Sequence, residues 1–152
     1  MKSNYNKIAI GGTFDKLHKG HEALIKTAFE MADEVLIGIT SDEFANNKNH
    51  IIEPCKSRIK RLKKIINKYD KKYQIKEIFD STGTADKDPQ LDAIVVSHET
   101  EQSAVYINTV RRETGLKPLD IIVIEWVFAD DGVPISSTRI RKGEIDQKGK
   151  LL

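Results

Sequence analysis

Cysteine is nearly absent from this chain of 152 residues, in which Cys55 is the single one. One cysteine cannot form an internal disulfide, so a framework of disulfide bonds like that of small secreted domains is excluded. No uninterrupted apolar run approaches the roughly 20 residues that a membrane-spanning helix needs. Neither terminal segment has the basic start and long apolar stretch of a signal peptide. We therefore expect a cytoplasmic protein without a membrane segment.

A strong charge of one sign is also missing. Lys and Arg number 25 against 23 Asp and Glu, so the net charge by itself indicates no partner. Basic residues crowd between Lys56 and Lys72, but Ile59 and Leu62 belong to an apolar stripe that predicts an amphipathic helix with a solvated outer face. Nucleic-acid readers mix basic patches with stacking aromatics, whereas Trp126 and the phenylalanines fall mainly in apolar runs typical of a core. We expect no nucleic-acid partner.

Short apolar runs alternate with helical patterns along the chain. The runs are mostly continuous, as in strands that are buried on both faces, and they span Ile8–Ile10, Val35–Ile39, Ile75–Phe79, Ala93–Val96 and Ile121–Val127. Helical patterns cover His21–Ala32, Lys56–Tyr69 and Glu101–Thr114. This alternation predicts an α/β fold: a Rossmann-like, doubly wound sheet of about five parallel strands with helices on both faces.

The length fits one domain, which we expect to span residues 1–152, with the tail from about Gln147 loosely ordered. Two long polar connections, Thr40–Pro54 and Asp80–Leu91, separate the elements. In an open parallel sheet a ligand crevice forms at the carboxyl ends of the strands, where the winding direction reverses. We therefore expect the functional residues at the strand ends, with Asp80–Leu91 as a wall of the site.

The most informative segment runs from Gly11 to His21. It follows the Ile8–Ile10 run and precedes a helical pattern, so it lies at a strand-to-helix turn. Glycine lets the main chain approach a ligand closely, and the first turn of a helix presents unpaired amide donors. The segment therefore predicts a phosphate-binding site. Residue patterns alone lead to nucleotide binding and no further.

A resemblance extends this interpretation. Thr13-Phe14-Asp15 followed by His18-Lys19-Gly20-His21 resembles the signature of the HxGH nucleotidyltransferases, which join a nucleoside monophosphate to a phosphate-bearing acceptor. Ile135-Ser136-Ser137-Thr138-Arg139-Ile140-Arg141 resembles the serine-rich segment of that superfamily, which opens a late helix and holds the triphosphate. Between them, Val96–Thr100 and Ala104–Leu119 resemble the archaeal and eukaryotic-type phosphopantetheine adenylyltransferases. The resemblance covers nearly the whole chain.

The resemblance implies a reaction and its partners. AMP would pass from ATP to 4'-phosphopantetheine, giving dephospho-coenzyme A and pyrophosphate by direct in-line attack. Mg²⁺ is expected with ATP and held mainly by it, because the sequence has no cluster of carboxylates and no His/Cys spacing for a dedicated metal site. The oligomeric state stays open.

The resemblance also assigns roles to the catalytic candidates. His21 would stabilise the transition state and His18 would contact ATP. Lys48 would lie against the acceptor or the transferred phosphate, with Lys56 and Arg58 as competing candidates for that contact.

The turn residues receive roles as well. Thr13 would bind the acceptor phosphate, the ATP phosphates or both. Phe14 would act as a packing wedge whose amide faces phosphate. Asp15 has the wrong charge for a phosphate ligand, so it would orient a neighbouring donor or cap the turn.

The late motif and the fourth strand complete the predicted ATP site. Arg139 and Arg141 cannot both point the same way on one helix, so at least one would face solvent or an acidic neighbour. The remaining predicted ATP contacts are Gly12, His98, Glu99, Thr100, Asn108, Ile135, Ser136, Ser137, Thr138 and Arg139.

Two kinds of alternative remain. Another HxGH nucleotidyltransferase, such as a glycerol-phosphate cytidylyltransferase, a nicotinamide-mononucleotide adenylyltransferase or an FAD synthetase, would share the chemistry. Cytidylyltransferases usually carry an Arg-Thr-x-Gly-Ile-Ser-Thr type of late motif, so the segment from Ile135 to Arg139 disfavours them. A noncatalytic nucleotide- or RNA-binding module is the alternative of another class, because one fold hosts many functions.

Overall fold

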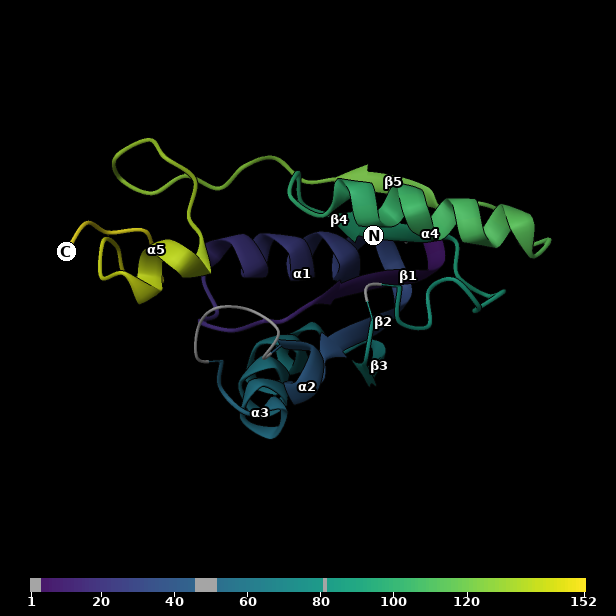
Figure 1. Cartoon of the computed structure of the whole chain (residues 1–152), viewed down its shortest axis with the longest axis horizontal. Coiled ribbons are helices and arrows are strands. Elements are labelled where there is room, and N and C mark those ends of the chain that lie inside the picture. The colour runs from purple at the N-terminus through teal and green to yellow at the C-terminus, as the bar shows by residue number, and fades with distance from the viewer. Residues whose placement is uncertain (1–3, 46–51, 81) are drawn as a thin grey trace.

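Five strands form one sheet in the computed structural model, which describes residues 4–45, 52–80 and 82–152 (Figure 1). The strands are β1 (Tyr5–Gly12), β2 (Ala32–Thr40), β3 (Lys72–Ile78), β4 (Ala93–Val96) and β5 (Asp120–Val123). Their order across the sheet is β3-β2-β1-β4-β5, and every neighbouring pair is parallel. The predicted Rossmann-like parallel sheet is confirmed.

Helices cover both faces of this sheet, as predicted. They are α1 (Lys19–Met31), α2 (Asp42–Ala45), α3 (Cys55–Ile66), a 3₁₀ turn (Asn67–Tyr69), α4 (Glu101–Glu113) and α5 (Ser137–Arg141). Helices α1 and α3 pack on one face, whereas α4 packs on the other against β4 and β5. Figure 1 shows the short α5 and the C-terminal segment beside the N-terminal end of α1.

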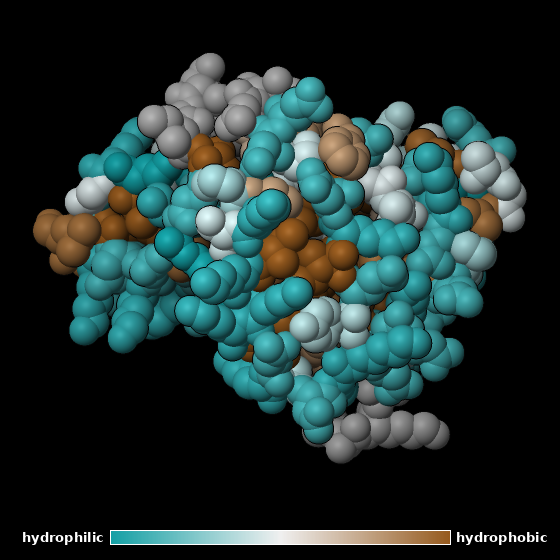
Figure 2. Space-filling model, turned by 90° about the horizontal axis from the view of Figure 1, so that it is seen from below, coloured by the Kyte–Doolittle hydropathy of each residue, from teal (hydrophilic) through white to brown (hydrophobic). Residues whose placement is uncertain are grey.

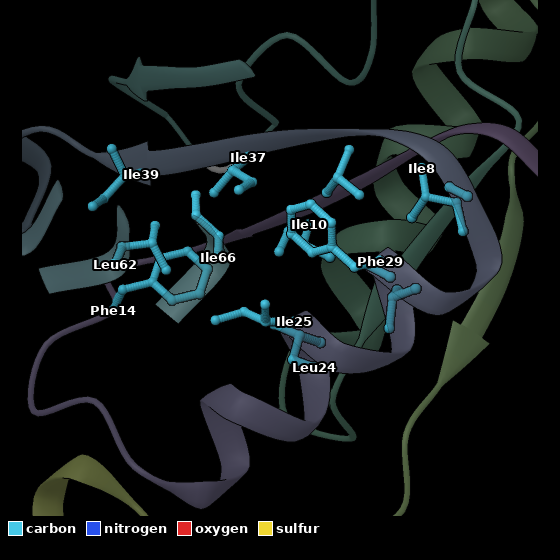
Figure 3. Packing of buried hydrophobic residues seen from close by; sticks show 14 of the residues in the cluster. Ile8, Ile10, Phe14, Leu24, Ile25, Phe29, Ile37, Ile39, Leu62 and Ile66 are labelled. Carbon is cyan, nitrogen blue, oxygen red and sulfur yellow. The ribbon is translucent and has the colours of Figure 1, made fainter. Parts of the chain in front are cut away.

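The larger core lies between the sheet and helices α1 and α3. Successive strand residues point to opposite faces, so Ile8 and Ile10 of β1 face this layer while Ala9 between them faces α4. Figure 3 shows Ile25 and Phe29 of α1 packed against these strands. Full burial of such a side chain contributes about 1.5–3 kcal/mol, so the core fixes α1 against β1 and with it the turn between them.

The second face has a smaller core, in which Ala104 and Ile107 of α4 meet small and branched residues of the sheet. Arg111 is fully buried and donates hydrogen bonds of 2.8 Å from Nη1 to the carbonyl oxygens of Ala85 and Asp88. This arginine therefore holds the connection after β3 against α4. It has a structural role.

Two predicted strand ends were too long. β5 ends at Val123 instead of continuing to Val127, and β3 ends before Phe79, whose surface is 66% exposed. Trp126 is 39% exposed, so its predicted place in the core was wrong. Phe79 and Trp126 follow the last paired residue of their strands, so the sheet and its covering helices do not bury their side chains. The face drawn in Figure 2 is mostly polar and has apolar side chains at the bottom of a central hollow.

The last residues of the chain contact the first turn of α1. Gln147 accepts a backbone hydrogen bond of 3.2 Å from the Lys19 amide, and Ile145 forms an isolated antiparallel bridge with Leu151. The low order expected from residue 147 onward stays a prediction, which hydrogen exchange would test.

Candidate active site

A crevice of about 410 Å³ lies at the carboxyl ends of β1 and β4, where the winding of the sheet reverses. Three segments and Ile52 line it: the turn after β1 with the start of α1, the turn after β4, and the chain from Ile124 to Val127 together with the late motif. Most predicted site residues are among its lining: Gly12, Thr13, Phe14, His18, His21, His98, Glu99, Thr100, Ile135, Ser136, Ser137 and Thr138. The structure therefore brings the two sequence motifs into one site.

The histidine pair forms the start of α1. His18 is the N-cap residue and accepts a hydrogen bond of 3.0 Å at Nδ1 from the Gly20 amide, while the His18 amide donates a bond of 3.2 Å to Nδ1 of His21. The two rings lie 3.9 Å apart between centroids. A Cβ on Gly20 would come within 2.7 Å of Cε1 of His18. Only glycine leaves room for this arrangement.

Both imidazoles are neutral near pH 7. Burial lowers the pKa of His18 to about 4, and burial together with the neighbouring His18 lowers the pKa of His21 to about 3. Because each Nδ1 accepts a hydrogen bond, the single ring proton of each neutral histidine is on Nε2. The pair is therefore suited to donate N–H bonds to an anion and not to act as an acid at neutral pH.

The Thr13 turn is held from beneath by Arg58. This guanidinium is 1% exposed, and its Nη1 donates to the carbonyl oxygens of Thr13 (3.0 Å) and Thr40 (2.8 Å). Thr40 in turn donates a hydrogen bond of 3.1 Å from Oγ1 to Oγ1 of Thr13. Arg58, considered above as a phosphate ligand, is not among the residues lining the crevice and instead fixes the turn that lines it.

Phe14 has the packing role predicted for it. Its ring is 2% exposed and belongs to the larger core, although the residue has a φ of 53°. Left-handed backbone is costly for a bulky residue, so burial of the ring stabilises the sharp turn between β1 and α1.

The late motif begins with an N-cap, as a serine before a helix predicts. Ser136 accepts a hydrogen bond of 3.2 Å at Oγ from the Arg139 amide, and Ser137 donates one of 2.8 Å from Oγ to the carbonyl oxygen of Asp15. Nη1 of Arg141 donates a 2.9 Å bond to Oδ2 of Asp15. The late motif is thereby joined directly to the first motif.

Three predicted site residues have another outcome. The guanidinium of Arg139 is bound by Asp131 and Glu144 outside the crevice lining. The side-chain amide of Asn108 is buried and exchanges both its hydrogen bonds with the backbone of Leu119, at 2.9 and 2.7 Å. Neither residue is among those that line the crevice. Lys48 lies outside the described residues.

A second, mainly apolar cleft of about 350 Å³ adjoins the crevice on the α4 face of the sheet. The two share Gly11, Gly12, Thr13 and Thr100 in their linings. The wall from Thr82 to Ala85 belongs to the connection that was expected to border the site. A ligand with a charged end and a long, less polar arm fits this pair of cavities.

Comparison with known proteins decides between families. The cytidylyltransferase-like family matches residues 9–143. A phosphopantetheine adenylyltransferase of Methanothermobacter thermautotrophicus is 50% identical over 100% of this chain and 93% of that protein, and one of Pyrococcus furiosus is 46% identical over 98% and 95%.

The chain belongs to the phosphopantetheine adenylyltransferases. A crystal structure of an Archaeoglobus fulgidus protein of unknown function is similar as well, with a TM-score of 0.73, 30% identity, and coverage of 86% of this chain and 99% of that one. The predicted family and the nucleotidyltransferase class are confirmed.

Sequence reasoning missed two residues that line the crevice of this adenylyltransferase. Trp126 lines the crevice and stacks on His98, with ring centroids 5.1 Å apart and an interplanar angle of 19°. Arg141 lines it too. The spacing from Ser137 to Arg141 is i to i+4, which puts both on one helix face, so Arg141 was accessible to pattern reasoning. The place of Trp126 in the crevice lining could not be predicted, because the sequence pattern extended the last strand to Val127 whereas β5 ends at Val123.

The part of the chain that the structure describes has neither a metal-binding cluster nor a helix suited to span a membrane. Within residues 4–45, 52–80 and 82–152, no group of three or more His, Cys, Asp or Glu side chains is arranged to hold a metal ion. Over those residues, no helix combines the length and apolar character that crossing a membrane requires.

Proposed function

We propose that this chain transfers the adenylyl group of ATP to 4'-phosphopantetheine, which gives dephospho-coenzyme A and pyrophosphate. The carrying observation is the 50% identity over the full chain to a phosphopantetheine adenylyltransferase. A phosphate oxygen of the acceptor attacks the α-phosphorus of ATP. The bond from that phosphorus to the oxygen bridging to the β-phosphorus breaks, and pyrophosphate leaves with the electron pair.

The residues of the crevice support direct transfer. Negative charge grows on the phosphoryl oxygens in the transition state, so donors that are already in place lower the barrier. His21 and His18, both neutral with the proton on Nε2, offer such donors beside the Thr13 turn. We assign His21 the stabilising role and His18 a contact with the ATP phosphates.

Positioning is the second contribution. Two anions must be brought together in line, and a fixed geometry replaces the entropy that their encounter would otherwise cost. Thr13 lines both cavities, so we place it at the point where the acceptor phosphate meets the α-phosphate. Lys48 is kept as a proposed contact of the transferred phosphate.

The acceptor arm would occupy the apolar cleft. Gly38 of β2 and Ile107 of α4 form part of its floor and wall, and the Thr82–Ala85 segment closes one side. Magnesium would arrive with ATP and neutralise part of the triphosphate charge.

Pyrophosphate release tests the proposal. Purified protein with magnesium is given ATP or CTP, each combined with 4'-phosphopantetheine, glycerol phosphate or nicotinamide mononucleotide. We expect pyrophosphate release with the pair of ATP and 4'-phosphopantetheine and with none of the other pairs. Activity with a different pair would refute the acceptor or nucleotide assignment while keeping the nucleotidyl transfer.

The reactions with CTP test the cytidylyltransferase alternative, because the matching family is described as cytidylyltransferase-like. A preference for CTP would favour it over the adenylyltransferase.

A further inference from the structure

We propose that Arg111 is a positioning residue for the acceptor, because it fixes the Thr82–Ala85 segment that forms a wall of the apolar cleft. The inference rests on the proposed function, in which the arm of 4'-phosphopantetheine occupies this cleft. Arg111 itself lines neither the cleft nor the crevice. It therefore acts through the wall and not by touching a substrate.

The Arg111 guanidinium joins the connection after β3 to two other parts of the fold. Nη1 donates to the carbonyl oxygens of Ala85 and Asp88, and Nε donates to that of Lys117, each over 2.8 Å. Arg111 is 0% exposed, so water does not compete for these bonds. Because the donors of a guanidinium form a rigid fork, the last residue of the wall is fixed relative to α4 and to the chain that leads into β5.

The wall depends on such anchors because it lies in bends and turns. Inside it, the Ala85 amide donates a hydrogen bond of 3.2 Å to the carbonyl oxygen of Thr82. At its start, Oδ1 of Asp80 accepts bonds from the amides of Thr82 (3.1 Å) and Gly83 (2.7 Å). Asp80 is exposed, whereas Arg111 is buried. Hydrogen bonds are stronger away from water, so the arginine is the firmer of the two anchors.

The wall packs tightly against the rest of the cleft and is separate from the crevice. A Cβ at Gly83, which has a φ of 57°, would come within 2.7 Å of Cγ2 of Ile78, a residue of the same lining. None of the four described residues of the wall lines the crevice proposed for ATP. A shift of the wall should therefore change contacts with the acceptor and leave those with ATP intact.

Helix α4 supplies a matched control. Arg112 is the next residue and is exposed, so Arg112→Met removes the same charge outside the buried network. Arg111→Met keeps an apolar stem but removes every donor to the wall. Arg111→Lys keeps the charge and part of the hydrogen bonding, so its effect should fall between those of Arg111→Met and the unaltered chain.

Steady-state pyrophosphate release by the full chain tests the inference. A wall that withdraws about 50 Å² of apolar contact weakens acceptor binding about tenfold. We expect Arg111→Met to raise KM for 4'-phosphopantetheine by about tenfold, with KM for ATP and kcat close to those of the unaltered chain. Arg112→Met should leave all three values unchanged.

This pattern separates positioning from stability. If Arg111 served the fold alone, its replacement would reduce the folded fraction, which lowers kcat and leaves both KM values unchanged. Thermal unfolding shows whether Arg111→Met is folded at the assay temperature. Where it is not, Arg111→Lys decides, because it should give the same selective rise in KM at a smaller size.

Amide hydrogen exchange gives a readout that needs no activity. Exchange reports local opening of the chain, and the amides of Ala85 and Asp88 bond within the connection. Exchange at these amides should be faster in Arg111→Met and Arg111→Lys than in Arg112→Met.

Three outcomes would overturn the inference. Unchanged KM for 4'-phosphopantetheine in both Arg111 variants would remove the arginine from acceptor binding. Equal rises in KM for both substrates would show that it does not act through the wall, and exchange no faster than in Arg112→Met would show that the wall does not depend on it. If the unaltered chain uses a different acceptor, the proposed function fails. A selective rise in KM for that acceptor still supports positioning by Arg111, and an unchanged KM overturns it.

Discussion

The guanidinium of Arg58 and the carbonyl oxygen of Thr13 are joined by a 3.0 Å hydrogen bond, although 45 positions separate them in the chain. The same guanidinium donates from Nε to the Glu53 carbonyl oxygen and from Nη2 to Oδ1 of Asp42. A single buried cation thus ties the ends of β1 and β2 to the start of α3.

Replacement of this cation should destabilise the protein. Arg58→Met leaves several buried carbonyl groups without donors, and loss of one partner from a buried charged network costs about 3–5 kcal/mol. We expect a comparable decrease in the free energy of unfolding, measured by urea denaturation. Lys60→Met, at an exposed position of the same helix, should change it little. Equal effects of the two variants would contradict the role of Arg58.

The histidine pair should make stability depend on pH. The pKa values of His18 and His21 in the folded chain, about 4 and about 3, lie below the ordinary value of 6.5. Between the folded and the unfolded pKa values, the unfolded chain binds more protons than the folded chain does. The contribution of the two neutral histidines to the free energy of unfolding is therefore fully present above pH 6.5 and is lost as the pH falls toward 4. Each histidine contributes a slope of up to about 1.4 kcal/mol per pH unit. Urea unfolding at several pH values measures this, and His21→Ala should flatten the curve.

Replacement of His21 should lower turnover much more than it changes substrate affinity. Removal of one preorganised donor to a transition state typically lowers kcat by about 10²–10³. We expect a decrease of that size in His21→Ala, with a much smaller change in KM for either substrate, from steady-state pyrophosphate release. A near-normal kcat would exclude the assigned role, provided that the thermal midpoint is retained.

The glycine between the histidines separates stability from activity. Alanine favours a helix over glycine, but a Cβ at position 20 would come 2.7 Å from Cε1 and 3.0 Å from Nδ1 of His18. Gly20→Ala should therefore reduce pyrophosphate release without lowering the thermal midpoint. A variant as active as the original would mean that the His18 ring can shift without consequence.

Arg139 should affect stability more than ATP use. The Arg139 guanidinium is the main reason that the pKa of Asp131 is held below its usual value, and Arg139 also donates to the carbonyl oxygens of Val133 and Pro134. We expect Arg139→Ala to lower the thermal midpoint while KM for ATP changes much less than in Arg141→Ala. The reverse pattern would restore the original assignment of Arg139.

Local patterns were sufficient for the sheet and for α1, α3 and α4, because buried runs such as Ala93–Val96 and the apolar stripe of α3 are determined by period and length. The short α2 lies within the connection Thr40–Pro54, where no helix was predicted. The first motif was located by its position between an apolar run and a helical pattern, and the late motif by its resemblance to the serine-rich segment of the superfamily. Strand ends were less predictable. Phe79 and Trp126 are as apolar as a core residue, and only the pairing of the sheet shows that they lie beyond it.

Side-chain partners were the other limit. A polar side chain such as that of Asn108 could contact a ligand. Its partner is instead the backbone of Leu119, the residue just before β5. Arg139 is held outside the crevice lining by Asp131, and Arg141 within the lining is paired with Asp15, which lies 126 positions earlier in the sequence. Such choices need the tertiary structure, because the energy of a buried charge depends on its actual partner.

The bond between Asp15 and Arg141 has a consequence for how the protein is made. Because 126 positions separate the two residues, the contact can form only after nearly the whole chain has been made. A shortened chain that stops before Ser136 would keep all five strands. It would lack the serines and the arginine that complete the lining of the crevice.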